Sequence, residues 1–94
     1  MNTLPFKEVY VDEKKSVRTF SPKDSDDMVW HQDADNRKVK LVSGTGWYLQ
    51  LDNELPRLLR AKRWHIIPKL KWHRLICTSI SSTAVIEVVR LEDI

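Results

Sequence analysis

The 94-residue sequence contains one cysteine, only two glycines and no long apolar run. A single cysteine, Cys77, cannot form an internal disulfide, which is typical of proteins from a reducing compartment. No apolar segment approaches the roughly 20 residues of a transmembrane helix, so the sequence predicts no membrane association. The N-terminal residues also lack the basic start and apolar stretch of a secretory signal. We therefore expect a cytoplasmic protein.

The composition limits the class of protein further. Hydrophobic residues make up 41% and charged residues 31% of the chain, which is typical of a folded globular protein. A chain of this length has room for one hydrophobic core, so residues 1–94 are predicted to form a single domain. The formal net charge of +3 is modest for a protein that binds nucleic acid.

The sequence also lacks any helical apolar stripe longer than two turns, and its short segments alternate with period two. The predicted strands are 4–11, 16–20, 28–31, 37–42, 47–51, 63–68, 72–78 and 83–91. Ser43–Gly46 holds both glycines and predicts a tight hairpin. Lys69–Lys71 predicts a turn after which 72–78 returns along 63–68. Short strands with polar turns indicate an all-β antiparallel sandwich or barrel.

Two short motifs in this strand pattern resemble those of the cupins. Ile67-Pro68 is followed, five residues past the proline, by His73, as in the second cupin motif. His31-Gln32-Asp33 and the strand that ends at Gly44 are similar to the first motif. The resemblance implies a cupin-type jelly-roll barrel of short antiparallel strands. It places N-terminal strands in 4–20 and the barrel motifs in 28–91.

The chain also departs from the cupin pattern. A metal-binding cupin usually supplies two histidines and a glutamate from the first motif and one histidine from the second. Here Asp33 stands at the second position and Arg37 stands where the glutamate is expected. The usual glycines of the second motif, near Lys62 and at Leu70, are also absent.

The metal interpretation depends on three side chains. His31 and Asp33 are two residues apart, so on an extended strand they share a face. With His73 from the other motif they suit zinc, iron, manganese or nickel. Against this, an arginine cannot ligate a metal and repels a cation. Arg37 shares the inward face with Val39, and we expect it to pair with Asp33.

The sequence therefore favours a second interpretation, a small-ligand-binding protein without catalytic machinery and without a required cofactor. Arg37 would hold a carboxylate, phosphate or sugar-like molecule at the mouth of the barrel. The predicted ligand-binding residues are His31, Asp33, Arg37, Gln50 and His73. The competing function is a metal-dependent cupin enzyme, of isomerase or dioxygenase type, that uses His31, Asp33 and His73. A third reading is structural, in which Arg37 closes an internal ion pair and the pocket holds only water.

Two further expectations concern partners. Trp30 and Trp72 directly precede the two motif histidines, so they face outward and could form a homodimer surface. The basic stretch 57–74, with Trp64 and Trp72, could instead serve a nucleic-acid or protein interaction module. The sequence contains no recognisable nucleic-acid-binding motif, so we expect no nucleic-acid partner. The outward-facing tryptophans lead us to expect a homodimer.

Overall fold

A computed structural model describes residues 6–22 and 29–91, and these residues form eight strands joined by turns and loops. In chain order the strands are β1 (Phe6–Tyr10), β2 (Lys15–Phe20), β3 (Asn36–Ser43), β4 (Trp47–Leu51), β5 (Arg57–Leu58), β6 (Trp64–Ile67), β7 (His73–Cys77) and β8 (Ala84–Leu91). Within the described ranges there is no helix that is long and apolar enough to cross a membrane.

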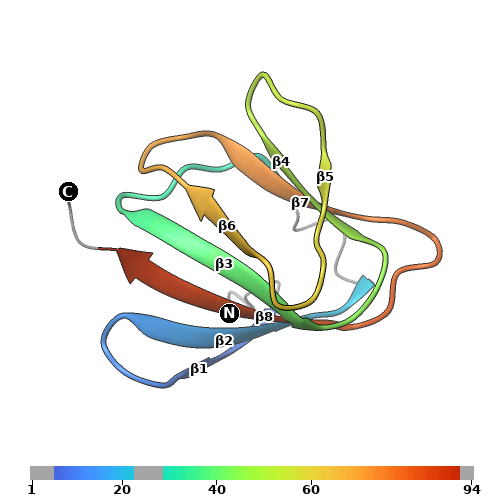
Figure 1. The fold of residues 1–94 in the computed structure, drawn as a ribbon, viewed down its shortest axis with the longest axis horizontal. Coiled ribbons are helices and arrows are strands. Elements are labelled where there is room, and N and C mark those ends of the chain that lie inside the picture. The colour runs from blue at the N-terminus through green and yellow to red at the C-terminus, as the bar shows by residue number, and fades with distance from the viewer. Residues whose placement is uncertain (1–5, 23–28, 92–94) are drawn as a thin grey trace, which may run out of the picture.

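The strands form two antiparallel sheets. The larger sheet has the order β1-β2-β8-β3-β6, and the smaller has the order β5-β4-β7 (Figure 1). All ladders between these strands are antiparallel. The predicted all-β antiparallel class is therefore confirmed.

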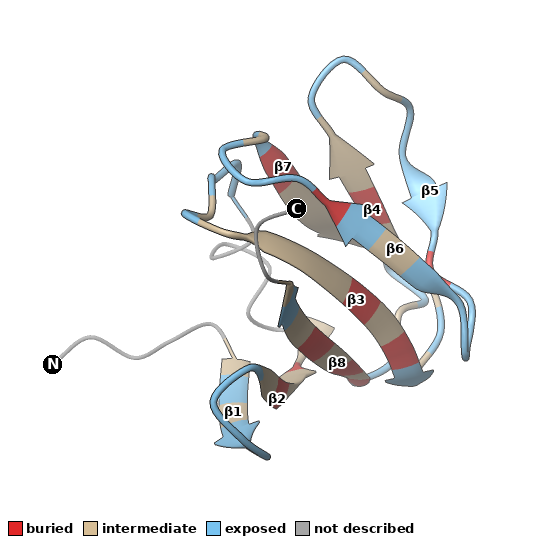
Figure 2. Ribbon diagram, turned by 60° about the vertical axis from the view of Figure 1, so that its left-hand side comes forward, coloured by how far each residue is buried: buried red, intermediate tan, exposed pale blue. Residues whose placement is uncertain are grey.

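The core lies between the two sheets, where the inward positions of each strand meet. In β3, Val39 and Leu41 are buried; in β4, Trp47 and Leu49 are buried. The buried bands in Figure 2 follow this alternation along β3, β4 and β8, while β5 and most of β1 are exposed. Burial of such a side chain stabilises the fold by roughly 1.5–3 kcal/mol. Trp47, with none of its surface exposed, satisfies its indole N–H at the Ser82 carbonyl.

Three predictions are wrong, two about which strands pair and one about whether a strand forms. The segment around both glycines is no hairpin, because β3 and β4 belong to different sheets and the turn carries the chain from one to the other. The strand 72–78 does not return along 63–68, because β6 lies beside β3 and β7 lies beside β4. Val29–His31 forms no strand; only His31 makes an isolated bridge, with His73.

Gly44 is required where the chain changes sheets. Its φ is +117°, and an added Cβ would lie 2.7 Å from the Thr83 carbonyl oxygen and 2.9 Å from Cα of Ala84. No side chain fits this contact without a shift of the backbone at the start of β8, so the glycine lets the chain leave β3 in close contact with the neighbouring strand of the same sheet.

Lys62 and Leu70 adopt the left-handed backbone conformation, with φ of 68° and 62°. These are the places where the cupin motif usually has glycine. Both turns therefore hold, with a large side chain, a backbone conformation that glycine adopts without strain. L-residues with large side chains adopt this conformation at a cost of about 1–2 kcal/mol.

Several sequence expectations fall partly outside the described residues. The first strand was expected to begin at residue 4, and the structure describes it from Phe6. Most of the loop predicted at 21–27, and Met28, also lie outside the described ranges, as do the first and last residues of the predicted domain 1–94.

Candidate metal and ligand site

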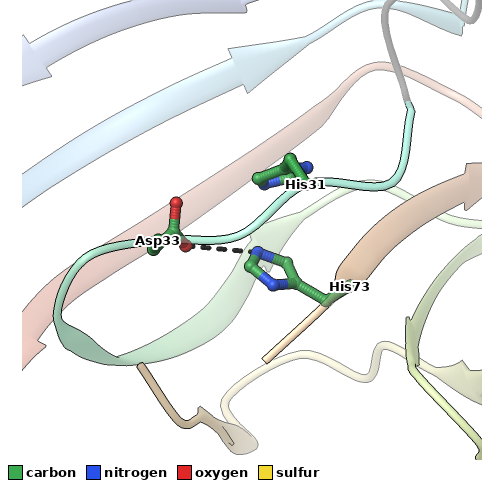
Figure 3. Close-up of side chains that lie close together, drawn as sticks. All are labelled: His31, Asp33 and His73. Atoms are coloured by element: carbon green, nitrogen blue, oxygen red, sulfur yellow. Dashed lines mark ion pairs between the residues drawn. The ribbon is translucent and has the colours of Figure 1, made fainter. Parts of the chain in front are cut away.

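The two motif histidines meet through their backbones. The N–H of His31 donates to the carbonyl of His73 at 3.0 Å, and the N–H of His73 donates to the carbonyl of His31 at 3.0 Å. The imidazole rings then lie edge to face, with centroids 4.2 Å apart. Figure 3 shows both rings beside Asp33, with His73 projecting from the start of β7. The bridge joins a segment before β3 to a strand of the other sheet.

Both histidine rings are oriented in the same way. Nδ1 of His31 lies 2.9 Å from the carbonyl oxygen of Val29, and Nδ1 of His73 lies 2.8 Å from the carbonyl oxygen of Lys71. A carbonyl oxygen can only accept, so each Nδ1 donates its proton. Each ring is therefore left with Nε2 as its ligand atom, which is the arrangement common in metal-binding histidines.

Asp33 completes the cluster. Its Oδ2 lies 3.2 Å from Nε2 of His73, and its Oδ1 lies 3.6 Å from Nη1 of Arg37. The ligand atoms of His31, Asp33 and His73 all lie within 4.8 Å of one another. Burial raises the pKa of Asp33, but the hydrogen bond from His73 and the charge of Arg37 outweigh it, so its pKa lies below the ordinary value. Asp33 is therefore a carboxylate at neutral pH.

The turn between β6 and β7 holds Asp33 in place. The N–H of Leu70 donates to the carbonyl of Asp33 at 2.8 Å, and the side-chain amide of Gln32 donates to the carbonyl of Leu70 at 2.8 Å. The N–H of Lys69 donates to Oδ1 of Asn36. The Pro68 turn thus ties the segment that bears two site residues to the start of the strand that bears His73.

Arg37 faces the core, as predicted from its position two residues before Val39 on the same strand. Its side chain is 18% exposed. Its partner is only partly the predicted one. The short contact, 2.7 Å, joins its Nε to Oδ1 of Asp35, whereas the contact with Asp33 is longer. Asp35 lies just before β3, two residues from Arg37 in the chain. Asp33 thus presents Oδ1 to Arg37 and Oδ2 to His73.

These side chains stand at the wall of a pocket of about 90 Å³ between the sheets. Its polar lining comprises Arg18, His31, Asp33, Arg37 and His73. The remaining lining is apolar and comes from β1, β2, β3, β4, β6, β7 and β8. An apolar pocket with a few convergent polar groups is the usual form of a small-molecule site. The space suffices for a small molecule or several waters.

Gln50 does not reach this pocket. It alternates with the inward-facing Leu49 on β4, so it lies on the other face of the strand. Its Oε1 accepts a hydrogen bond from Nε of Arg74 at 2.9 Å, and its Nε2 donates to the Glu54 carbonyl at 3.1 Å. The structure therefore brings together four of the five predicted ligand residues and leaves Gln50 apart.

Arg18 is a pocket residue that sequence reasoning missed. It lies on β2 between the inward positions Ser16 and Phe20, and its guanidinium carbon lies 4.4 Å from the centroid of the Phe6 ring. Its Nε donates to Oε2 of Glu8 at 2.6 Å. The available signal was the spacing of Arg18 and Phe20. Residues two apart on a strand share a face, so an arginine two residues from a buried phenylalanine points inward.

Other sequence expectations remain predictions. Trp30 and Trp72 are partly exposed, and the guanidinium of Arg74 lies 4.7 Å from the centroid of the Trp30 ring. On the basic stretch, Trp64 is 37% exposed and Nζ of Lys38 lies 4.3 Å from its ring centroid. Neither surface has a partner to identify its role, so the homodimer and the interaction module stay predictions, as does the cytoplasmic location.

The chain resembles known proteins in its fold. No protein-family model and no curated protein sequence matches it. Solved structures do match. A cupin domain from Bordetella pertussis Tohama I is 15% identical, with a TM-score of 0.61 over 98% of this chain and 99% of that one. A cupin-like protein from Thermotoga maritima MSB8 is 17% identical, with a TM-score of 0.67 over 89% of this chain and 65% of that one.

A third similar structure is the Fe(II) form of HppE, 14% identical, with a TM-score of 0.64 over 82% of this chain and 41% of that protein. The protein is therefore an antiparallel two-sheet jelly roll with a pocket between its sheets. Within this class the chain has the cupin fold, as the resemblance of its two motifs predicted.

Proposed function

We propose that this protein binds one divalent metal ion through His31, Asp33 and His73, and that the adjoining pocket holds a small molecule beside that ion. The observation that carries the proposal is the matched orientation of the two imidazoles. Each Nδ1 is engaged by a carbonyl oxygen two residues earlier in the chain, so both Nε2 atoms are available on the side of Asp33. Orientation by such a second hydrogen bond is characteristic of metal-binding histidines.

The contact between His73 and Asp33 also favours this function. A carboxylate can only accept, so Nε2 of His73 must carry a proton to bond to Asp33 when no metal is bound. A divalent ion replaces the Nε2 proton and satisfies both the imidazole and the carboxylate. The residues present therefore fit a metal ion.

Two imidazoles and one carboxylate are a ligand set used for non-haem iron and for catalytic zinc, and it leaves coordination positions open. An ion held by these groups would supply Lewis-acid character to a ligand oxygen. The similarity to the Fe(II) form of HppE agrees with such a site. The side chains of the protein would then orient the ligand, Arg37 by charge and the apolar wall by exclusion of water.

The positive charge of Arg37 opposes a cation at this place, and two features reduce the opposition. Asp35 compensates the guanidinium at 2.7 Å. The long contact of 3.6 Å with Asp33 involves Oδ1, whereas Oδ2 is the oxygen nearest His73. Asp33 can therefore serve the metal with one oxygen and Arg37 with the other.

Metal analysis of the purified full-length protein tests this function. We expect about one transition-metal ion per chain after purification without chelator, and loss of that ion in His31→Ala. Leu55 is exposed and lies outside the cluster, so Leu55→Ala is the control and should retain the ion. Protein that contains no bound metal, and takes up none when dialysed against Zn²⁺, Fe²⁺, Mn²⁺ or Ni²⁺, would overturn the proposal.

A further inference from the structure

A second pocket, also of about 90 Å³, adjoins the first. Arg18, Arg37 and Val88 line both pockets, so the two spaces are separated only by shared side chains. The linings differ in character. The second is lined by one carboxylate, Glu8, and by five basic side chains, which are Lys14, Lys15, Arg18, Arg37 and Arg90.

The strand register concentrates this charge at one end of the large sheet. Arg37 on β3 and Arg90 on β8 are direct cross-strand partners. Like charges in that position destabilise a sheet unless something compensates them. Asp35 does so unequally, since it lies 2.7 Å from Nε of Arg37 but 3.9 Å from Nη1 of Arg90. The adjacent Arg18 adds a third guanidinium to the same pocket.

Glu8 is the one carboxylate in the lining of this pocket, and it pairs with Arg18 and Ser16 through a single oxygen. Its Oε2 accepts hydrogen bonds from Nε of Arg18 at 2.6 Å and from the hydroxyl of Ser16 at 2.8 Å. Arg18 binds it side-on through Nε, and a guanidinium carries four further N–H donors. The same holds for Arg37, whose short contact with Asp35 also uses Nε. Donors of both guanidiniums therefore exceed the carboxylates that these contacts supply.

We propose that the second pocket is a subsite for an anionic oxygen group, a carboxylate or a phosphate, bound by Arg18, Arg37 and Arg90. Planar guanidiniums form paired hydrogen bonds with such groups, and they do so most strongly where water is partly excluded. The rest of the ligand extends past Arg37 into the apolar pocket beside His31 and His73. This last step rests on the proposed function, whereas the anion subsite itself does not.

The test is a titration of the metal-free, full-length protein with inorganic phosphate, followed by NMR of the arginine Nε–H signals. We expect saturable shifts for Arg18, Arg37 and Arg90, with a dissociation constant in about the millimolar range. Arg90→Gln should weaken binding about fivefold or more. Arg60→Gln, which removes an exposed charge elsewhere, should leave it unchanged. A parallel titration with acetate shows whether a carboxylate is accepted as well.

Non-saturable shifts, or equal weakening by the two substitutions, would overturn the subsite. Because the metal is removed beforehand, failure of the metal site cannot produce either result. A second titration, with n-butyl phosphate, tests the extension into the apolar pocket. Binding at least about tenfold tighter than that of phosphate is expected, since the butyl group leaves water for the space beside Ile67 and Leu75. Equal affinity for the two probes would refute the extension.

Discussion

Oδ2 of Asp33 lies 3.2 Å from Nε2 of His73, and the turn after Pro68 also contacts Asp33 through the Leu70 N–H. Asp33 lies in the segment that leads into β3, a strand of the large sheet. His73 begins β7, a strand of the small sheet. A metal ion or a proton between these atoms therefore ties the two sheets together. Stability and ligand binding at this site are consequently coupled.

Asp33→Asn should abolish the stabilisation that a divalent ion gives. The wild-type protein is expected to show a higher melting temperature with excess Zn²⁺, because the ion binds the folded state. An amide supplies no negative charge, so the affinity should fall by more than about 100-fold. Asp52→Asn is the matched control, since Asp52 is an exposed carboxylate that does not belong to the cluster. An equal zinc-induced shift in Asp33→Asn would contradict the assigned role.

Leu70→Gly should stabilise the protein by about 0.5–1 kcal/mol. Glycine removes the steric strain of the left-handed conformation, and the greater conformational entropy of glycine in the unfolded chain offsets only part of that gain. Leu70 has a φ of 62° and is 61% exposed, so little packing is lost. Urea denaturation measures the difference. The exposed Leu55, whose φ is not positive, supplies the control, and Leu55→Gly should lower stability. A loss of stability in both variants would refute the strain at Leu70.

His65 should make stability depend on pH near neutrality. Its Nε2 is buried without a hydrogen-bond partner among the described residues. Burial lowers the pKa of His65, and the charges of Arg57 and Arg63 lower it further. The unfolded chain then binds more protons below about pH 6.5, so the free energy of unfolding falls as pH falls through that value. His65→Leu should reduce this slope; parallel curves for the two proteins would show that His65 does not contribute.

Gly44→Ala should destabilise the protein by about 1–3 kcal/mol, through a close contact with β8 and a positive φ. Thermal or urea unfolding measures the effect. Ser43→Ala, at the exposed neighbouring position, should change stability little. If the two substitutions have similar effects, the close approach of Gly44 to the start of β8 is not a constraint on the fold.

Most strand positions were predictable from the sequence, with 28–31 as an exception, but strand partners were not. The alternation of Arg37, Val39 and Leu41 correctly predicted the inward face of β3, because a half-buried strand must alternate. The same local pattern cannot tell whether a turn joins neighbours or changes sheets. Pro68 and Gly44 both mark turns that change sheets, and that choice depends on packing across the whole core.

The candidate site was predictable for residues whose chemistry is distinctive. His31, Asp33 and His73 were placed together on the resemblance of two motifs, and the structure brings them within ligand distance of one another. The backbone carbonyls that orient the imidazoles were not predictable, because any residue supplies a carbonyl. Gln50 was misplaced because its polar side chain suggested a ligand contact, although its alternation with Leu49 directed it outward.

Calorimetric titration of the metal-free, full-length protein with Co²⁺ tests the central claim most directly. The three ligands predict saturable binding of one ion per chain, and His31→Ala should lose that binding while it keeps the fold, since His31 is exposed. Circular dichroism of the variant confirms the fold. The account is contradicted if the wild type binds no ion, or if His31→Ala binds Co²⁺ with the same stoichiometry and affinity.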